Sequence, residues 1–114
     1  MLEKTVNLSQ LFDFYGNLLT PRRQEIMRLY FYQDYSLGEI AENLEISRQG
    51  VHDHLKKAEE QLHEYEDKLG MLSSYQVLQK ETDCLLARLE KDKPLEEQDR
   101  QQLLEAVRRI KNCL

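Results

Sequence analysis

The residues from 36 to 62 contain the pattern that most constrains how this chain folds. Ser36 and Glu39 form a capping box, in which the hydroxyl and the carboxylate each accept a hydrogen bond from a free backbone N–H at a helix start. Apolar residues follow at helical spacing, Ser47 offers a second cap, and a further apolar stripe begins at Val51. Two capped helices joined by a short turn predict a helix-turn-helix.

Two more helices are predicted before this motif. Thr20 is a suitable cap, and Pro21 suits the first helical position because the N–H that proline lacks has no helical partner there. The amphipathic residues 2–18 are expected to cover the back of the motif or to pack against a second chain. Because the sequence shows no strand alternation, the expected class is all-α, with a helix-turn-helix of the winged-helix-like DNA-binding type but without a wing.

The second half of the chain predicts a helical hairpin. Gly70 is expected to end the long second helix of the motif and to separate a helix-turn-helix domain, residues 1–70, from residues 71–114. Two apolar stripes in the latter are joined by a short polar connector, and Pro94 suits the start of the last helix. The hairpin is expected to serve as a packing or dimerisation element.

The apolar stripe of the second motif helix is longer than a small core requires. It continues from Leu62 through Tyr65 and Leu69 to Leu72, and a three-helix core cannot bury all of this length. We expect either the C-terminal segment or a second copy of the chain to cover it. A homodimer is therefore predicted.

If the motif binds nucleic acid, the outer face of its second helix predicts the contacts. Arg48 and Gln49 are the residue types that read guanine and adenine edges in a major groove, and nearby lysines and arginines suit phosphates. The predicted nucleic-acid-binding residues are Arg22, Arg23, Arg48, Gln49, His52, Lys56 and Lys57.

The charge of the chain opposes this interpretation. The net charge is −5, and residues 1–60 hold seven basic and ten acidic side chains. Because phosphate neutralisation supplies most non-specific affinity, we expect weak binding to random DNA. Asp53 lies in the middle of the predicted contact face, where a negative charge is unfavourable near phosphate. A solvated surface and a protein contact remain alternative roles for this face.

No enzyme, cofactor or metal site is predicted. His52 and His54 are two residues apart on a helix and point about 160° away from each other. The sequence has no glycine-rich phosphate loop and no nucleophile with a base. No apolar run approaches the roughly 18 residues that span a bilayer, and polar residues interrupt the N-terminal segment, so we expect a cytoplasmic protein without membrane insertion.

Two family resemblances accompany these patterns. Residues 19–62 resemble region 4 of bacterial sigma factors through the sequence LTPRRQEIMRLYFYQDYSLGEIAENLEISRQGVHDHLKKAEEQL. One departure is Glu45, which stands in the turn where that pattern often has glycine. The whole chain resembles the YlxM family of small bacterial proteins, which are encoded beside signal recognition particle genes. This resemblance implies a role in the signal recognition particle pathway of protein targeting, with components of that particle as partners.

Two classes of function remain open from the sequence. The chain is either a regulator whose helix-turn-helix binds DNA or a structured RNA, or an adaptor whose helix-turn-helix contacts a protein or ribonucleoprotein. A coherent basic face would favour nucleic acid, and it would include Arg22, Arg23, Arg48, Lys56 and Lys57. If Asp53 and Glu60 instead neutralise scattered positive charges on this face, the adaptor is favoured.

Overall fold

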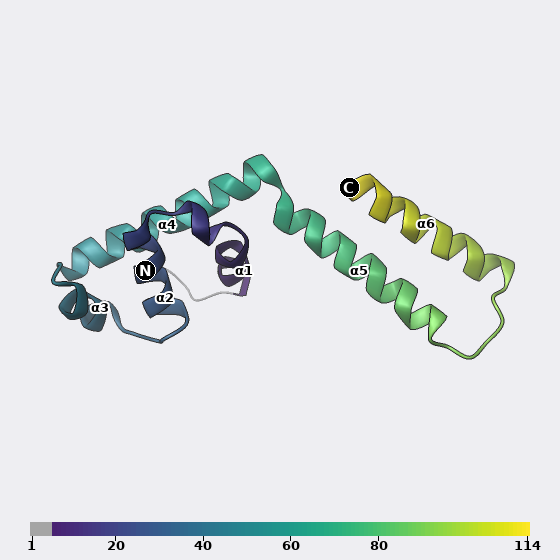
Figure 1. Cartoon of the computed structure of the whole chain (residues 1–114), viewed down its shortest axis with the longest axis horizontal. Coiled ribbons are helices and arrows are strands. Elements are labelled where there is room, and N and C mark those ends of the chain that lie inside the picture. Colours follow the sequence, from purple (N-terminus) through teal and green to yellow (C-terminus); the bar gives the residue numbers. More distant parts are fainter. Residues whose placement is uncertain (1–5) are drawn as a thin grey trace. The chain divides into compact units, whose positions relative to one another are not determined.

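The computed structural model describes residues 6–114, and every regular element in this range is helical (Figure 1). This confirms the predicted all-α class. The chain divides into two compact units, Met1–Gly70 and Met71–Leu114. The elements in chain order are α1 (Val6–Tyr15), the 3₁₀ turn η1 (Gly16–Leu18), α2 (Pro21–Phe31), α3 (Leu37–Leu44), α4 (Arg48–Leu69), α5 (Met71–Leu89) and α6 (Glu97–Cys113).

The first unit is built around α4, against which α1, α2 and α3 all pack (Figure 1). Each of these helices contributes side chains to one apolar core. The most deeply buried of them, at 2% exposure or less, are Leu8, Leu11, Tyr15, Ile26, Met27, Ile40, Val51, Leu55, Ala58 and Leu62. The helix-turn-helix pair α3–α4 therefore rests on a core that α1 and α2 complete.

The predicted N-terminal helix is present as α1, which ends at Tyr15. Its first part, residues 2–5, lies outside the described residues. After Tyr15 the chain continues as η1, and Leu18, which the α-helical spacing placed on the inner face, is 55% exposed. A 3₁₀ helix turns once every 3.0 residues rather than every 3.6, so the face that a residue presents changes within a single turn.

The apolar stripe of α4 is covered from within its own unit as far as Tyr65, contrary to the sequence-based expectation. The Tyr15 ring of α1 lies 6.1 Å from the Tyr65 ring, and its hydroxyl donates a hydrogen bond to Glu66 Oε1 at 2.5 Å. The Tyr65 hydroxyl in turn donates to the Leu18 carbonyl at 3.4 Å. Leu62 is fully buried, whereas Leu69 is 56% exposed. The expectation that Tyr65 needs the C-terminal segment or a second copy for cover was therefore wrong.

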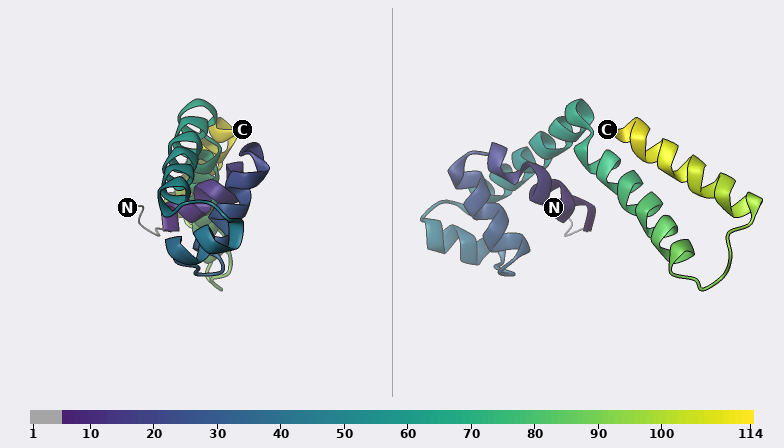
Figure 2. Two further views of the ribbon diagram at one scale, coloured as in Figure 1. Left: turned by 90° about the vertical axis from the view of Figure 1, so that its left-hand side faces the viewer. Right: turned by 45° about the vertical axis from the view of Figure 1, so that its right-hand side comes forward.

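The second unit is an antiparallel pair of helices, α5 and α6, which lie side by side (Figures 1 and 2). The sequence placed the start of the last helix at Pro94, but α6 begins at Glu97. The backbone N–H of Glu96 donates to Asp99 Oδ2 at 3.1 Å, so an acidic side chain in the first turn caps the helix. This local hydrogen bond determines where α6 starts more strongly than the favourable φ of Pro94 does.

Candidate nucleic-acid interface

Both helices of the motif begin at the predicted caps. The backbone N–H of Glu39 donates to Ser36 Oγ at 3.1 Å, and the Ser36 N–H donates to Glu39 Oε1 at 3.0 Å. These bonds from Ser36 hold the pKa of the Glu39 carboxyl below its usual value of 4.5. Ser47 Oγ accepts from the Gly50 N–H at 2.9 Å at the start of α4. The caps fix where each helix starts, and hence which side chains α4 presents outward.

The turn between the two helices contains a strained residue. Glu45 ends α3 in the left-handed conformation, with φ 56° and ψ 43°. A side chain costs roughly 1–2 kcal/mol in this conformation because Cβ approaches the following carbonyl oxygen. Glycine avoids this cost.

We expect Glu45→Gly to stabilise the chain by about 0.5–1 kcal/mol, since relief of the steric strain exceeds the added flexibility of the unfolded chain. Glu42→Gly is the matched control, because Glu42 is exposed in the right-handed interior of the same helix. That change should instead destabilise by about 1 kcal/mol. Urea unfolding followed by circular dichroism measures both, and equal losses of stability would contradict the assignment of strain to Glu45.

Three of the predicted phosphate-binding residues come together where the start of α2 meets α4. Partial burial lowers the pKa of His54 below its ordinary value of 6.5. The guanidinium groups of Arg23 and Arg22 and the ammonium group of Lys57 lower it further, while Asp53 has a smaller opposite effect. Three cations therefore lie near enough to this imidazole to disfavour its protonated form. We call Arg22, Arg23, His54 and Lys57 the basic cluster.

The position of Arg23 within the basic cluster is fixed by α4. Its Nη1 donates to Gln61 Oε1 at 2.8 Å, and the side chain is half-buried. Its backbone N–H donates to Thr20 Oγ1 at 3.4 Å, which is the predicted cap of α2. The hydrogen bond to Gln61 thus orders the Arg23 side chain before any ligand binds. Less side-chain entropy is then lost on binding.

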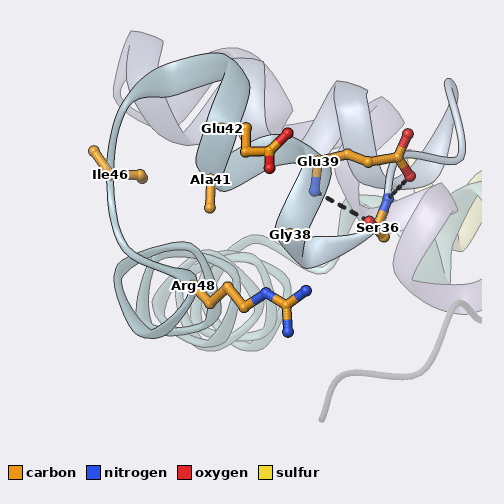
Figure 3. A pocket seen from close by; sticks show the side chains of 7 residues that line it. All are labelled: Ser36, Gly38, Glu39, Ala41, Glu42, Ile46 and Arg48. Carbon is orange, nitrogen blue, oxygen red and sulfur yellow. Dashed lines mark hydrogen bonds between the residues drawn. The ribbon is translucent and has the colours of Figure 1, made fainter.

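Arg48 lies apart from the basic cluster, on the side of α4 that faces α3. Figure 3 shows its side chain extending from the start of α4 toward the first turn of α3. A Cβ atom on Gly38 would lie 2.6 Å from the Arg48 guanidinium, so the glycine makes room for it. Ser36 and Glu42 line the same shallow hollow. Arg48 therefore lies beside the acidic side chains Glu39 and Glu42 of α3 and does not join the other arginines.

The outer face of α4 between these two positions is electrically mixed. Gln49 Nε2 donates to Asp53 Oδ1 at 2.9 Å, so both side chains already have a partner. His52 is half-buried, with its Nδ1 3.8 Å from the same carboxylate oxygen. Lys56 is exposed on this face. A ligand that reads bases through Gln49 must first break its bond to Asp53.

Sequence reasoning did not include His54 among the predicted residues. The spacing of His54 and Lys57, three residues apart, places them on one flank of the helix and could have paired them. The approach of Arg22 and Arg23 to this flank depends on how α2 crosses α4. Spacing along the chain carries no such information.

Within residues 6–114, no group of three or more His, Cys, Asp or Glu side chains is arranged to hold a metal ion. None of the helices in that range combines the length and apolar composition that crossing a membrane requires.

The capped α3–α4 pair, supported by α1 and α2, defines this chain as a helix-turn-helix protein. The family described as "Putative helix-turn-helix protein, YlxM / p13 like" matches residues 2–107. The chain belongs to this family, also called UPF0122, which confirms the resemblance seen in the sequence.

Relatives align with between two thirds and nearly all of the chain. A UPF0122 protein of Listeria innocua is 50% identical over 98 residues, which are 86% of this chain and 89% of the relative. A UPF0122 protein of Bacillus mycoides is 43% identical over 110 residues, 96% of this chain and 99% of its own length. One from Geobacillus kaustophilus is 53% identical over 76 residues, 67% and 69% of the two chains.

Proposed function

We propose that this protein is a helix-turn-helix regulator that binds nucleic acid and takes part in the signal recognition particle pathway in the cytoplasm. The basic cluster is the observation that carries the first part. It gathers three cations at one edge of α4, which is the recognition helix in this proposal, although the net charge of the chain is −5. A localised positive edge is the electrostatic footprint of nucleic-acid binding even when the whole chain is acidic.

In this proposal the basic cluster contacts phosphate and Arg48 contacts the nucleic acid on the other side of the recognition helix. Lys56 lies between these positions. A single helix-turn-helix has limited affinity, so the protein acts as a dimer that presents two recognition helices. The place in the targeting pathway rests on the family, whose members are encoded beside signal recognition particle genes.

A salt titration of binding tests the proposal. Fluorescence anisotropy should compare random duplex DNA, DNA from upstream of the protein's own operon, and signal recognition particle RNA with its protein. Three phosphate contacts per chain predict a slope of log K against log salt of roughly −3 per chain on duplex DNA. Tight, salt-dependent binding to the operon DNA or the particle RNA supports the proposal. A flat salt dependence on every ligand refutes it.

The second candidate is an adaptor that contacts a protein or ribonucleoprotein of the pathway without reading DNA. The observation that favours it is the Gln49–Asp53 hydrogen bond, which leaves a carboxylate in the middle of the outer face. Binding only to the intact ribonucleoprotein, with no binding to either DNA, would select this candidate.

The basic cluster also predicts a pH dependence of nucleic-acid binding. In the free protein the lowered pKa keeps His54 neutral at pH 7, and a bound phosphate offsets the surrounding positive charge and raises that pKa. Binding then takes up a proton, so affinity should increase as the pH falls from 7 through 6.5 toward the lowered pKa of the free protein.

Anisotropy measured between about pH 5.5 and 7.5 tests this, with His54→Gln expected to flatten the response. His63→Gln is the matched control, because His63 is an exposed histidine on the same helix outside the basic cluster. If both variants keep the same rise in affinity, the response comes from elsewhere.

A further inference from the structure

Two side chains of α4 lie beside the same carboxylate oxygen of Asp53. Gln49 Nε2 donates to Asp53 Oδ1 at 2.9 Å, and His52 Nδ1 lies 3.8 Å from the same atom. The first distance is that of a hydrogen bond, whereas the second is too long for one. Asp53 is therefore bonded to one of two neighbouring nitrogen atoms and close to the other.

The imidazole of His52 has a buried nitrogen that lacks a partner. The side chain is 33% exposed as a whole, but its Nδ1 is buried and has no hydrogen-bond partner among residues 6–114. A buried polar atom without a partner costs free energy, and a hydrogen bond removes that cost. A rotation of the Asp53 carboxylate that shortens the gap by about 1 Å would supply the acceptor.

The present bond from Gln49 to Asp53 is easily broken. Both residues are exposed, and side-chain pairs four residues apart on a helix surface contribute little to its stability. In the proposed function Gln49 reads a base edge, which requires the same amide group that Asp53 now accepts from. Release of this amide leaves the carboxylate without its donor on a face that approaches phosphates.

We propose that His52 is a positioning residue of the interface, which takes over Asp53 when Gln49 turns to a nucleic acid. The neutral imidazole then carries its proton on Nδ1 and donates a hydrogen bond to Asp53 Oδ1, while Nε2 becomes an acceptor. Gln49 exchanges the carboxylate for a base, and the buried nitrogen of His52 gains a partner. His52 thus acts on the ligand through Asp53.

This exchange also moves a negative charge away from the middle of the outer face. Successive residues of an α-helix are about 100° apart, so His52 lies between the buried Val51 and the outward Asp53 around the helix. A carboxylate that turns toward His52 therefore moves to the flank of α4. Arg48 lies one helical turn before His52 on that flank. Because repulsion of phosphate then decreases, the inference deepens the proposed function and rests on it.

The exchange can be tested without nucleic acid, since removal of the Gln49 amide should cause it in the free protein. In Gln49→Ala the His52 proton is expected to lie mainly on Nδ1. The ¹⁵N resonances of the two ring nitrogens distinguish this tautomer, and they are recorded on the full chain with ¹⁵N-labelled histidine at about pH 8. Adding Asp53→Ala should reverse the change. Gln79→Ala, which replaces an exposed glutamine of the second unit, is the matched control and should leave the resonances unchanged.

A second experiment distinguishes an action through Asp53 from a direct contact of His52 with the ligand. His52→Phe keeps a ring without its nitrogens and should weaken binding to DNA from upstream of the protein's own operon about threefold to fivefold. In a chain that already carries Asp53→Ala, the same substitution should have no further effect, because no carboxylate remains to be held. Anisotropy measures each affinity, and circular dichroism confirms that the variants remain helical.

The outcomes separate this inference from the proposed function. Unchanged His52 resonances in Gln49→Ala would overturn the inference, and so would an equal loss of affinity from His52→Phe with and without the Asp53 carboxylate. If the resonances change as expected and no nucleic acid is bound, the exchange of partners stands and only the proposed function fails.

Discussion

Replacing Tyr15 with alanine is expected to lower the free energy of unfolding by about 3–5 kcal/mol, the usual loss for a large buried aromatic ring. Tyr15 is 1% exposed, packs against Tyr65 and donates its hydroxyl proton to Glu66. A domain of this size has only about 5–15 kcal/mol in total, so the loss would shift urea unfolding strongly. Circular dichroism during urea titration measures it.

Two conservative variants separate the parts of this effect. Tyr15→Phe keeps the ring and should lose only about 1–3 kcal/mol, the contribution of a hydrogen bond to a charged group. Tyr32→Phe is the exposed control. The Tyr32 hydroxyl also donates to a carboxylate, that of Asp13, at 2.6 Å, but Tyr32 is 53% exposed. Its loss should stay below about 1 kcal/mol. If Tyr15→Ala lowers the free energy of unfolding no more than Tyr32→Phe does, the packing of α1 does not stabilise α4.

Reversing two charges of the basic cluster is expected to abolish most nucleic-acid binding. Arg22→Glu combined with Lys57→Glu should weaken binding by about a hundredfold or more, because two charge-assisted phosphate contacts become repulsive. The salt slope should also fall by about 2 per chain, since each lost contact removes about one unit. Anisotropy over a salt series measures both quantities.

A control with the same change in net charge is available in the hairpin. Lys80→Glu combined with Lys93→Glu alters two exposed lysines of the second unit. This variant should keep the slope and lose little affinity, because exposed charges outside the contact face are screened at physiological salt. If the two double variants weaken binding equally, net charge rather than the basic cluster determines affinity.

The features that the sequence predicted correctly are those set by neighbours in the chain. Ser36, Glu39 and Ser47 cap their helices through bonds that span three residues. Such contacts need only the chain itself, so residue type and spacing are sufficient to predict them.

The features that the sequence did not predict depend on how helices cross. The stripe on α4 showed that something covers Tyr65, but its spacing cannot distinguish Tyr15 of α1 from a second copy. Likewise, the approach of Arg22 to His54 is a property of the contact between α2 and α4. A periodic pattern specifies a face and leaves its partner undetermined.

Gly70 determines where α4 ends and therefore how long this helix is. Its φ of 61° ends α4, and a Cβ atom there would meet nothing within 4 Å. Only the backbone conformation therefore selects glycine at this position, and packing has no part in the choice. With a right-handed conformation at this one residue, the segments Arg48–Leu69 and Met71–Leu89 would become a single uninterrupted rod. One backbone conformation thus separates the helix-turn-helix unit from the helical hairpin.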